Sequence, residues 1–308
     1  MKGGGGMLEA HFLGTGAMMP LPARRLASLL VRRNGRLLLI DCGEGTQVAI
    51  RESGWSMAKI DQIAITHFHA DHIAGLPGLL LTMGTLGRAE PVELIGPKGL
   101  ELVVTYLRVI APMLPYELRF TEVDGPERSL AFADARLTLF ALEHVLPCYG
   151  CAIELDRAGR FDPARAKAER IPVGLWRRLQ SGETVEADGR VYAPDMVLGP
   201  PRKGLKLVYC TDTRPADAVA QYGAGADLMI LEGTYAEDDK AEKAAQFGHM
   251  TFAGAAALAE RAGAKELLLT HFSPAVDDPA PFLDIPRRVF PNTSLARDGL
   301  RRVLAFPD

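Results

Sequence analysis

Four side chains that can bind a metal ion lie within six residues of one another. They are His67, His69, Asp71 and His72, and they follow directly after the apolar run Ile60–Ile65. Imidazole and carboxylate groups suit zinc, at bond lengths of roughly 2.0–2.2 Å. On a loop or tight turn, the first two can bind one ion and the last two a second. The spacing therefore predicts half of a dinuclear metal site.

The remaining ligands are expected at the ends of other strands. The chain has seven histidines, and His144 and His271 each follow an apolar run. Asp212 follows a third such run, and its carboxylate can bridge two ions. A single histidine is more often an ordinary core or surface residue, which is what we expect of His11. The repeated placement after apolar runs favours a metal site over scattered structural histidines.

The elements that must position these side chains alternate between strand and helix patterns. Apolar strands are expected at residues 8–13, 26–31, 36–40, 60–65, 92–95, 136–142, 205–210, 227–231 and 266–269, and helices at residues 46–52, 75–86, 100–110 and 251–262. An Asn-Gly pair at residues 34–35 predicts a hairpin. Mixed elements of this kind indicate α/β layers around central sheets, and side chains at strand ends meet at one rim.

The composition is that of a globular protein. The 308 residues are 48% hydrophobic with a net charge of −3, which gives no general sign of nucleic-acid binding. Four cysteines are too few for a disulfide framework and fit reduced thiols in the cytoplasm. No run of about 18 apolar residues is present, so no membrane span is expected. Residues 1–6 are interpreted as a flexible leader.

One segment differs from the rest in charge. Residues 157–206 contain eleven lysines and arginines and six acidic residues, a net charge of +5, whereas the rest of the chain carries −8. Phosphate contacts are the function that such a segment could serve. The candidate side chains are Arg165, Lys167, Arg170, Arg177 and Arg178. The alternative is a solvated surface loop with incidental arginines.

The histidine motif resembles that of the metallo-β-lactamase superfamily, and the segments around it resemble ribonuclease Z, the tRNA 3′-processing endonuclease family. These segments are Phe12–Gly16, Asp41–Gln47, Gly75–Leu80, His144–Gly150, Thr211–Pro215, Thr270–Ser273 and Phe290–Thr293. The resemblance implies an α/β metallo-β-lactamase fold, an αββα four-layer sandwich. It further implies a single domain over residues 7–308, with a protruding basic arm inserted at residues 157–204 that binds substrate.

The resemblance also implies a ligand set. One zinc ion would be held by His67, His69 and His144, the other by Asp71, His72 and His271, with Asp212 bridging both. Mn²⁺ or Fe²⁺ can also enter a site of this composition. Asp41 is expected to form hydrogen bonds close to the ligands rather than to act in catalysis.

The implied activity is removal of the 3′ trailer of precursor tRNA, by phosphodiester hydrolysis that leaves a 3′-hydroxyl. Asp71 would also accept a proton, His249 would act as the acid, and Glu232 would orient His249. A cytoplasmic homodimer is implied as well.

Departures from the family pattern leave other substrates open. They lie at Pro20–Arg25, Pro172–Trp176 and Pro274–Ala275, positions that concern RNA placement rather than metal binding. The main alternative is a related metal-dependent phosphodiesterase acting on another nucleic acid or on a small phosphodiester. A lactonase, thiolesterase or β-lactamase, and a non-catalytic RNA-binding module, are further alternatives.

Overall fold

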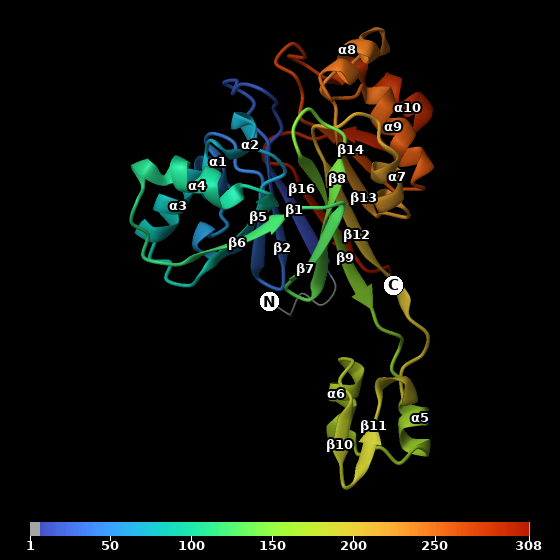
Figure 1. Ribbon diagram of the computed structural model, residues 1–308. Coiled ribbons are helices and arrows are strands. Elements are labelled where there is room, and N and C mark those ends of the chain that lie inside the picture. Colours follow the sequence, from blue (N-terminus) through green and yellow to red (C-terminus); the bar gives the residue numbers. More distant parts are fainter. Residues whose placement is uncertain (1–6, 308) are drawn as a thin grey trace. The chain divides into compact units, whose positions relative to one another are not determined.

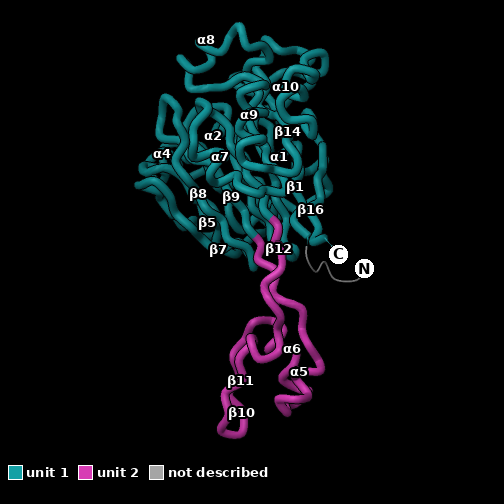
Figure 2. The backbone as a smooth tube through the Cα atoms, turned by 90° about the vertical axis from the view of Figure 1, so that its right-hand side faces the viewer, with its two compact units in different colours: residues 1–154, 206–307 teal, residues 155–205, 308 magenta. Residues whose placement is uncertain are grey.

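The computed structural model describes residues 7–307, which form two compact units (Figure 2). The first unit contains the chain up to Glu154 and from Lys206 to Pro307, and the second contains Leu155–Leu205. The predicted leader, residues 1–6, lies outside the described residues.

Two seven-stranded sheets form the centre of the first unit. The first sheet has the order β16-β1-β2-β3-β4-β5-β6. Its strands are β1 (Met7–Gly14), β2 (Ser28–Arg33), β3 (Arg36–Ile40), β4 (Ile60–Ala64), β5 (Val92–Pro97), β6 (Leu118–Val123) and β16 (Arg301–Ala305). Strands β3 to β6 are parallel to one another, whereas the pairs β16–β1, β1–β2 and β2–β3 are antiparallel.

The second sheet has the order β15-β14-β13-β12-β9-β8-β7. Its strands are β7 (Glu127–Phe132), β8 (Ala135–Leu142), β9 (Cys148–Arg157), β12 (Arg202–Cys210), β13 (Leu228–Glu232), β14 (Leu267–Thr270) and β15 (Thr293–Leu295). Strands β12 to β15 are parallel, and β7, β8 and β9 form an antiparallel meander.

Helices cover the outer face of each sheet (Figure 1). On the first sheet they are α1 (Thr46–Ser53), α2 (Ala70–Ile73), α3 (Leu76–Thr85) and α4 (Leu100–Leu107), and on the second α7 (Asp217–Gly223), α9 (Phe252–Arg261) and α10 (Asp284–Val289). Helix α8 (Ala241–Gln246) lies above α9 and α10, at the top of this view. The predicted four-layer αββα sandwich is therefore confirmed.

Continuous apolar strands explain why both faces of each sheet are covered. Alternate residues of a strand point to opposite faces. In β3, Leu37 and Leu39 pack with the buried residues of α1 and α3, whereas Leu38 and Ile40, fully buried as well, face the other way. In β13, Met229 and Leu231 pack with α7 and α9 in the same manner. Strands buried on both faces need apolar residues at every position.

Most of the predicted elements occur within two or three residues of their expected bounds. The Asn34-Gly35 hairpin forms between β2 and β3, with positive φ at both residues, as a type I′ turn requires. The expected helix 100–110 ends at Leu107 and continues as a 3-10 turn, Arg108–Ile110. Strands β6, β7, β9, β15 and β16 and helices α7, α8 and α10 were not predicted, because their apolar patterns are short or interrupted. Residues 70–73, expected in a loop or tight turn, form the single helical turn α2.

The second unit has a small core of its own. It contains α5 (Pro163–Ala168), α6 (Trp176–Gln180) and the hairpin β10 (Val185–Ala187) and β11 (Arg190–Tyr192). Asp162 caps α5 by accepting hydrogen bonds from the N–H groups of Ala164 and Arg165. The buried residues are Ala166, Ile171, Leu179, Val185, Tyr192 and Val197. Residues 155–205 thus form a packed unit rather than an irregular loop.

Across residues 7–307, no helix combines the length and the apolar character needed to cross a bilayer.

Candidate metal centre

The predicted ligands lie just beyond the ends of buried strands. His67 follows β4, His144 follows β8, Asp212 follows β12 and His271 follows β14. The backbone turns sharply at two of these points, since Asp212 has a φ of 56° and His271 a φ of 57°. Left-handed conformations are uncommon for residues other than glycine and often accompany functional sites. At both positions the turn occurs at a ligand immediately beyond a strand.

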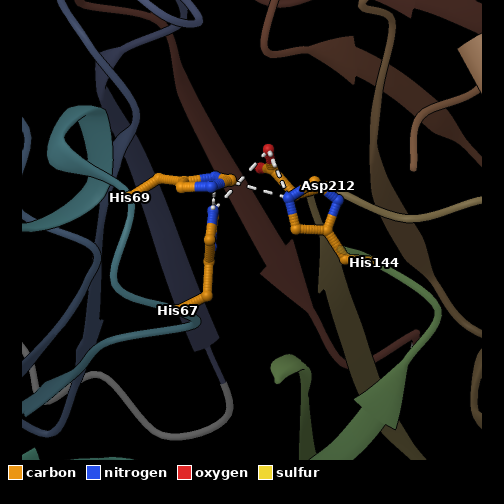
Figure 3. Close-up of side chains that lie close together, drawn as sticks. All are labelled: His67, His69, His144 and Asp212. Carbon is orange, nitrogen blue, oxygen red and sulfur yellow. Dashed lines mark hydrogen bonds and ion pairs between the residues drawn. The ribbon is translucent and has the colours of Figure 1, made fainter. Parts of the chain in front are cut away.

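Four side chains converge on a first position (Figure 3). The Nε2 atom of His67 lies 2.9 Å from Nδ1 of His69, and Nε2 of His144 lies 3.4 Å from the same Nδ1. Asp212 Oδ1 lies 3.8 Å from His67 Nε2 and 4.0 Å from His144 Nε2. Three imidazoles and one carboxylate oxygen therefore face a common point.

A second group lies next to the first. The Nε2 atoms of His72 and His271 are 3.1 Å apart, and Asp71 Oδ2 lies 3.5 Å from the former and 3.6 Å from the latter. Asp212 Oδ2 is 3.2 Å from each of the two Nε2 atoms. The two oxygens of Asp212 thus face the two groups, which is the arrangement a bridging carboxylate needs.

Hydrogen bonds hold the outer nitrogen of several ligand rings. Nδ1 of His72 donates to Asp41 Oδ2 at 2.8 Å, and Nδ1 of His144 donates to the carbonyl of Gly248 at 2.9 Å. Nδ1 of His271 lies 3.2 Å from the hydroxyl of Thr234. A proton on Nδ1 leaves the lone pair of Nε2 directed into the site. The expectation that Asp41 supports the ligands agrees with its contact to His72.

This donor set fits a bound cation. Asp212 Oδ2 is buried and, despite its short distances to two Nε2 atoms, has no hydrogen bond of acceptable geometry. His72 donates from Nδ1 to Asp41, which leaves its Nε2 facing the Nε2 of His271 at 3.1 Å. Lone pairs that converge without a proton between them are satisfied by a positive ion. A divalent metal meets that need.

The electrostatics of the cluster agree with this interpretation at Asp212, His67 and His144. Burial would raise the pKa of Asp212, but His271, His72 and His67 outweigh it and hold the pKa well below its usual value. Burial and the neighbouring His72 lower the pKa of His67. Burial likewise lowers the pKa of His144 despite the nearby Asp212. Ionised carboxylates and neutral imidazoles are the protonation states that bind metals. At His72, burial would lower the pKa, but the carboxylates of Asp212 and Asp41 outweigh it and raise the pKa, so this ring must release a proton when a metal binds.

His249 and Glu232 form a pair beside the ligands. His249 Nδ1 lies 3.2 Å from Glu232 Oε2, and 3.9 Å from Asp212 Oδ1. Burial opposes the charged form of His249, but Glu232 outweighs it and raises the pKa of the imidazole. Glu232 is fully buried and also accepts hydrogen bonds from the N–H of Thr213 at 2.7 Å and the hydroxyl of Thr234 at 2.6 Å. A fixed carboxylate of this kind orients its histidine.

The metal groups open onto a cavity of about 560 Å³. Its walls include side chains that were not among the predicted site residues: Met18, Val145, Thr234, Tyr235, Lys243, Phe247 and Ser273. Met18 also donates its N–H to Asp71 Oδ2 at 2.7 Å, from a left-handed backbone with a φ of 66°. Val145 and Ser273 lie in the segments His144–Gly150 and Thr270–Ser273, next to the predicted ligands His144 and His271.

Other candidates lie apart from the metal groups. His11 is buried and contacts Trp55, with ring centroids 5.5 Å apart, as expected of a core residue. All four cysteines are buried free thiols. Among residues 7–307, neither His11 nor a cysteine belongs to a potential metal-binding group.

The five basic candidates of residues 157–204 are exposed side chains of the second unit. Two of them have partners there. Arg165 donates to the carbonyls of Leu198 and Asp195, and Arg178 forms an ion pair with Glu183. Their proposed contact with substrate stays a prediction.

Comparison with known proteins places this geometry in a family. Residues 8–106 match the family model of the anti-Pycsar protein Apyc1, and residues 177–272 match that of the beta-lactamase superfamily domain. The chain is 52% identical to a ribonuclease Z of Lachnoclostridium phytofermentans, over 97% of this chain and 99% of that protein.

The chain belongs to the ribonuclease Z family.

Solved structures agree with this assignment. Human tRNase Z, short form, is 26% identical, with a TM-score of 0.67 over 97% of this chain and all of that one. The metallo-beta-lactamase fold protein YhfI of Bacillus subtilis superposes with a TM-score of 0.70 at 19% identity, over 97% of this chain and all of that one, and this likeness shows the shared fold. Membership in the ribonuclease Z family makes the protein a metal-dependent endoribonuclease.

Proposed function

We propose that the protein removes the 3′ trailer of precursor tRNA by hydrolysing one phosphodiester bond, which leaves a 3′-hydroxyl on the tRNA. One observation carries the proposal. Five of the seven predicted ligands and His249 line one cavity, in a chain half identical to a ribonuclease Z over nearly its full length. The other two ligands, His67 and His72, contact lining ligands, and Glu232 contacts His249.

We propose two zinc ions as the native metals, with Mn²⁺ or Fe²⁺ as chemically acceptable substitutes. His67, His69 and His144 would hold one ion, Asp71, His72 and His271 the other, and Asp212 would bind both. Two such ions lower the pKa of a bound water molecule and neutralise charge on a phosphate oxygen.

The protein groups then handle the protons. Asp71 has one oxygen fixed by the N–H of Met18, which sets the carboxylate to accept a proton from the attacking water. His249 directs Nδ1 toward Glu232, so Nε2 is the nitrogen that can protonate the leaving 3′ oxygen. The raised pKa of His249 keeps that proton available near neutral pH.

The second unit would supply affinity for the body of the tRNA. Arg165, Lys167, Arg170, Arg177 and Arg178 are exposed there, in a segment of net charge +5. We interpret residues 157–204 as a substrate-binding arm inserted into one metallo-β-lactamase domain. We propose the cytoplasm, where precursor tRNA is processed, as the location of the protein.

We further propose a homodimer. Helix α4 and the turn after it expose five large apolar side chains, at fractional exposures of 61% to 85%: Leu102, Tyr106, Val109, Ile110 and Met113. Apolar groups gathered in this way on one surface usually mark a protein contact. Ile110→Asp should shift sedimentation from dimer to monomer, whereas Val303→Asp, at an exposed apolar residue of β16, should not. A monomeric wild type would contradict the dimer.

The central test is cleavage of a 3′-extended precursor tRNA by the wild type and by His249→Ala, with metal content measured in both. Cleavage after the discriminator nucleotide, lost in a variant that keeps its metal, would support the proposed reaction and the role of His249. A wild type that hydrolyses bis(p-nitrophenyl) phosphate but not the precursor would overturn the tRNA substrate and favour a phosphodiesterase with another substrate.

A further inference from the structure

One wall of the catalytic cavity has no part in metal binding. Helix α8 contributes Lys243 to this wall, and Phe247, the residue just after the helix, lines it as well. Both side chains are exposed, whereas Ala244 between them is buried. The cavity is therefore lined on this side by one cation and one aromatic ring.

The two side chains share one face of a helical turn. They are four residues apart, and the N–H of Phe247 donates to the carbonyl of Lys243 at 3.2 Å. Residues at this spacing are neighbours on a helix surface. A ligand that meets the ring of Phe247 can thus meet the ammonium group of Lys243 as well.

Phe247 is poorly packed for a large apolar residue. Half of its surface is exposed, and the cavity also includes Met18 and Val145, which are 68% and 54% exposed. An exposed phenyl ring at a catalytic cavity is suited to stacking on a flat partner. In an endoribonuclease the flat groups that reach the cavity are nucleobases.

The backbone ties this wall directly to the reacting groups. Gly248 follows Phe247, and its carbonyl accepts the hydrogen bond from His144 Nδ1. Its φ of 77° and the 2.5 Å that would separate an added Cβ from His144 Nδ1 require glycine there. His249 comes next. The exposed ring of Phe247 and the proposed acid His249 therefore flank Gly248, and the hydrogen bond of Gly248 ties this segment to His144, a proposed metal ligand.

We propose that Phe247 stacks on a nucleobase next to the scissile phosphate, and that Lys243 binds a neighbouring phosphate of the same strand. The inference rests on the proposed endonuclease function and names the part of the substrate that this wall takes. Stacking on an aromatic side chain tolerates any base. The site would therefore position the strand for cleavage without selecting its sequence.

The test combines a variant of the protein with a variant of the RNA. Three precursor tRNAs are prepared. The first is intact, the second lacks the base of the discriminator nucleotide, and the third lacks the base of the first trailer nucleotide. Wild type, Phe247→Ala and Phe247→Trp are compared by kcat/KM, with metal content as a check on the site. Val303→Ala, which removes an exposed apolar side chain from β16, is the matched control.

Phe247→Ala should lower kcat/KM on the intact precursor by about 5- to 150-fold, the range measured for loss of base stacking. On the abasic precursor that lacks the stacked base, it should cause little further loss, because the ring has no base to meet. Phe247→Trp should retain most of the activity. The abasic position at which Phe247→Ala no longer lowers kcat/KM identifies the base that stacks on Phe247.

Lys243→Gln should raise KM for the precursor and reduce the slope of log K against log salt by about one, whereas Lys243→Arg should retain both. Lys240→Gln, a nearby exposed lysine outside the cavity, is the control for general charge loss.

An equal loss for Phe247→Ala on intact and abasic precursors, or no loss at all, would overturn the stacking site while tRNA cleavage by the wild type stands. A wild type that leaves the precursor uncut while hydrolysing bis(p-nitrophenyl) phosphate would overturn the proposed function, and this inference with it.

Discussion

The two units of this chain present their charged side chains in opposite ways. In the first unit, Asp212, His72 and His271 are buried, and each contacts several groups at 3 to 4 Å. In the second unit, the basic side chains are exposed, and those with partners bind carbonyl or carboxylate groups of their own unit.

This difference follows from what each task requires. A reacting group is useful only in one orientation, so its supporting contacts must be fixed before substrate arrives. Phosphate affinity is a sum over many weak, screened contacts, so each side chain can move. Single substitutions at the site of the first unit should therefore lower activity strongly, whereas single substitutions of basic residues in the second unit should lower it only slightly.

The largest effect should come from Asp212, the proposed bridging ligand. Asp212→Asn removes the charge of the carboxylate that faces both metal groups, so metal binding and all phosphodiester hydrolysis should fall by more than about 100-fold, the upper range for losing a supporting residue. Metal content by mass spectrometry and kcat on bis(p-nitrophenyl) phosphate measure it. Asp277→Asn, at an exposed aspartate, serves as the control. Full metal content in the Asp212→Asn variant would contradict the assignment.

The next effect should come from His249. Replacement by alanine should lower kcat on precursor tRNA by about 10²- to 10⁴-fold, the usual worth of a general acid, with metal content retained. Hydrolysis of bis(p-nitrophenyl) phosphate should suffer much less, because p-nitrophenolate leaves without a proton. Equal losses on both substrates would mean that His249 does not act as the acid.

A smaller effect is expected one contact away from the metal. Asp41→Asn weakens the hydrogen bond that orients His72, so metal affinity should fall by about 10- to 100-fold. Activity should recover when metal is added in excess, which titration with a chelator can follow. A variant with unchanged metal affinity would show that Asp41 acts only through its contacts with Thr66. Asp41 accepts hydrogen bonds from the N–H of Thr66 at 2.8 Å and from its hydroxyl at 3.0 Å.

The smallest effect should come from the second unit. Arg177→Gln should raise KM for precursor tRNA a few-fold, leave kcat unchanged and lower the salt slope by about one, as expected for one lost phosphate contact. Gln180→Ala, an exposed neighbour without charge, is the control. A fall in kcat comparable to that of His249→Ala would contradict the division of labour between the units.

Local patterns were sufficient to predict most of the first unit. Apolar runs that end in a histidine or carboxylate predicted both the strands β4, β8, β12 and β14 and the residues that follow them. The second unit was predicted only as a basic segment, because its helices have five or six residues and its strands three, too few to show a period.

By itself, the sequence determined the types of the candidate ligands and the ends of the strands that carry them. Those features depend on residues close together in the chain. Only the tertiary structure decided the contacts that turn ligands into a site: His72 beside His271, Met18 on Asp71, and Lys243 and Phe247 at the cavity wall. His72 and His271 are 199 residues apart, and no local period encodes a contact over that separation. The packing of two sheets against each other brings them together.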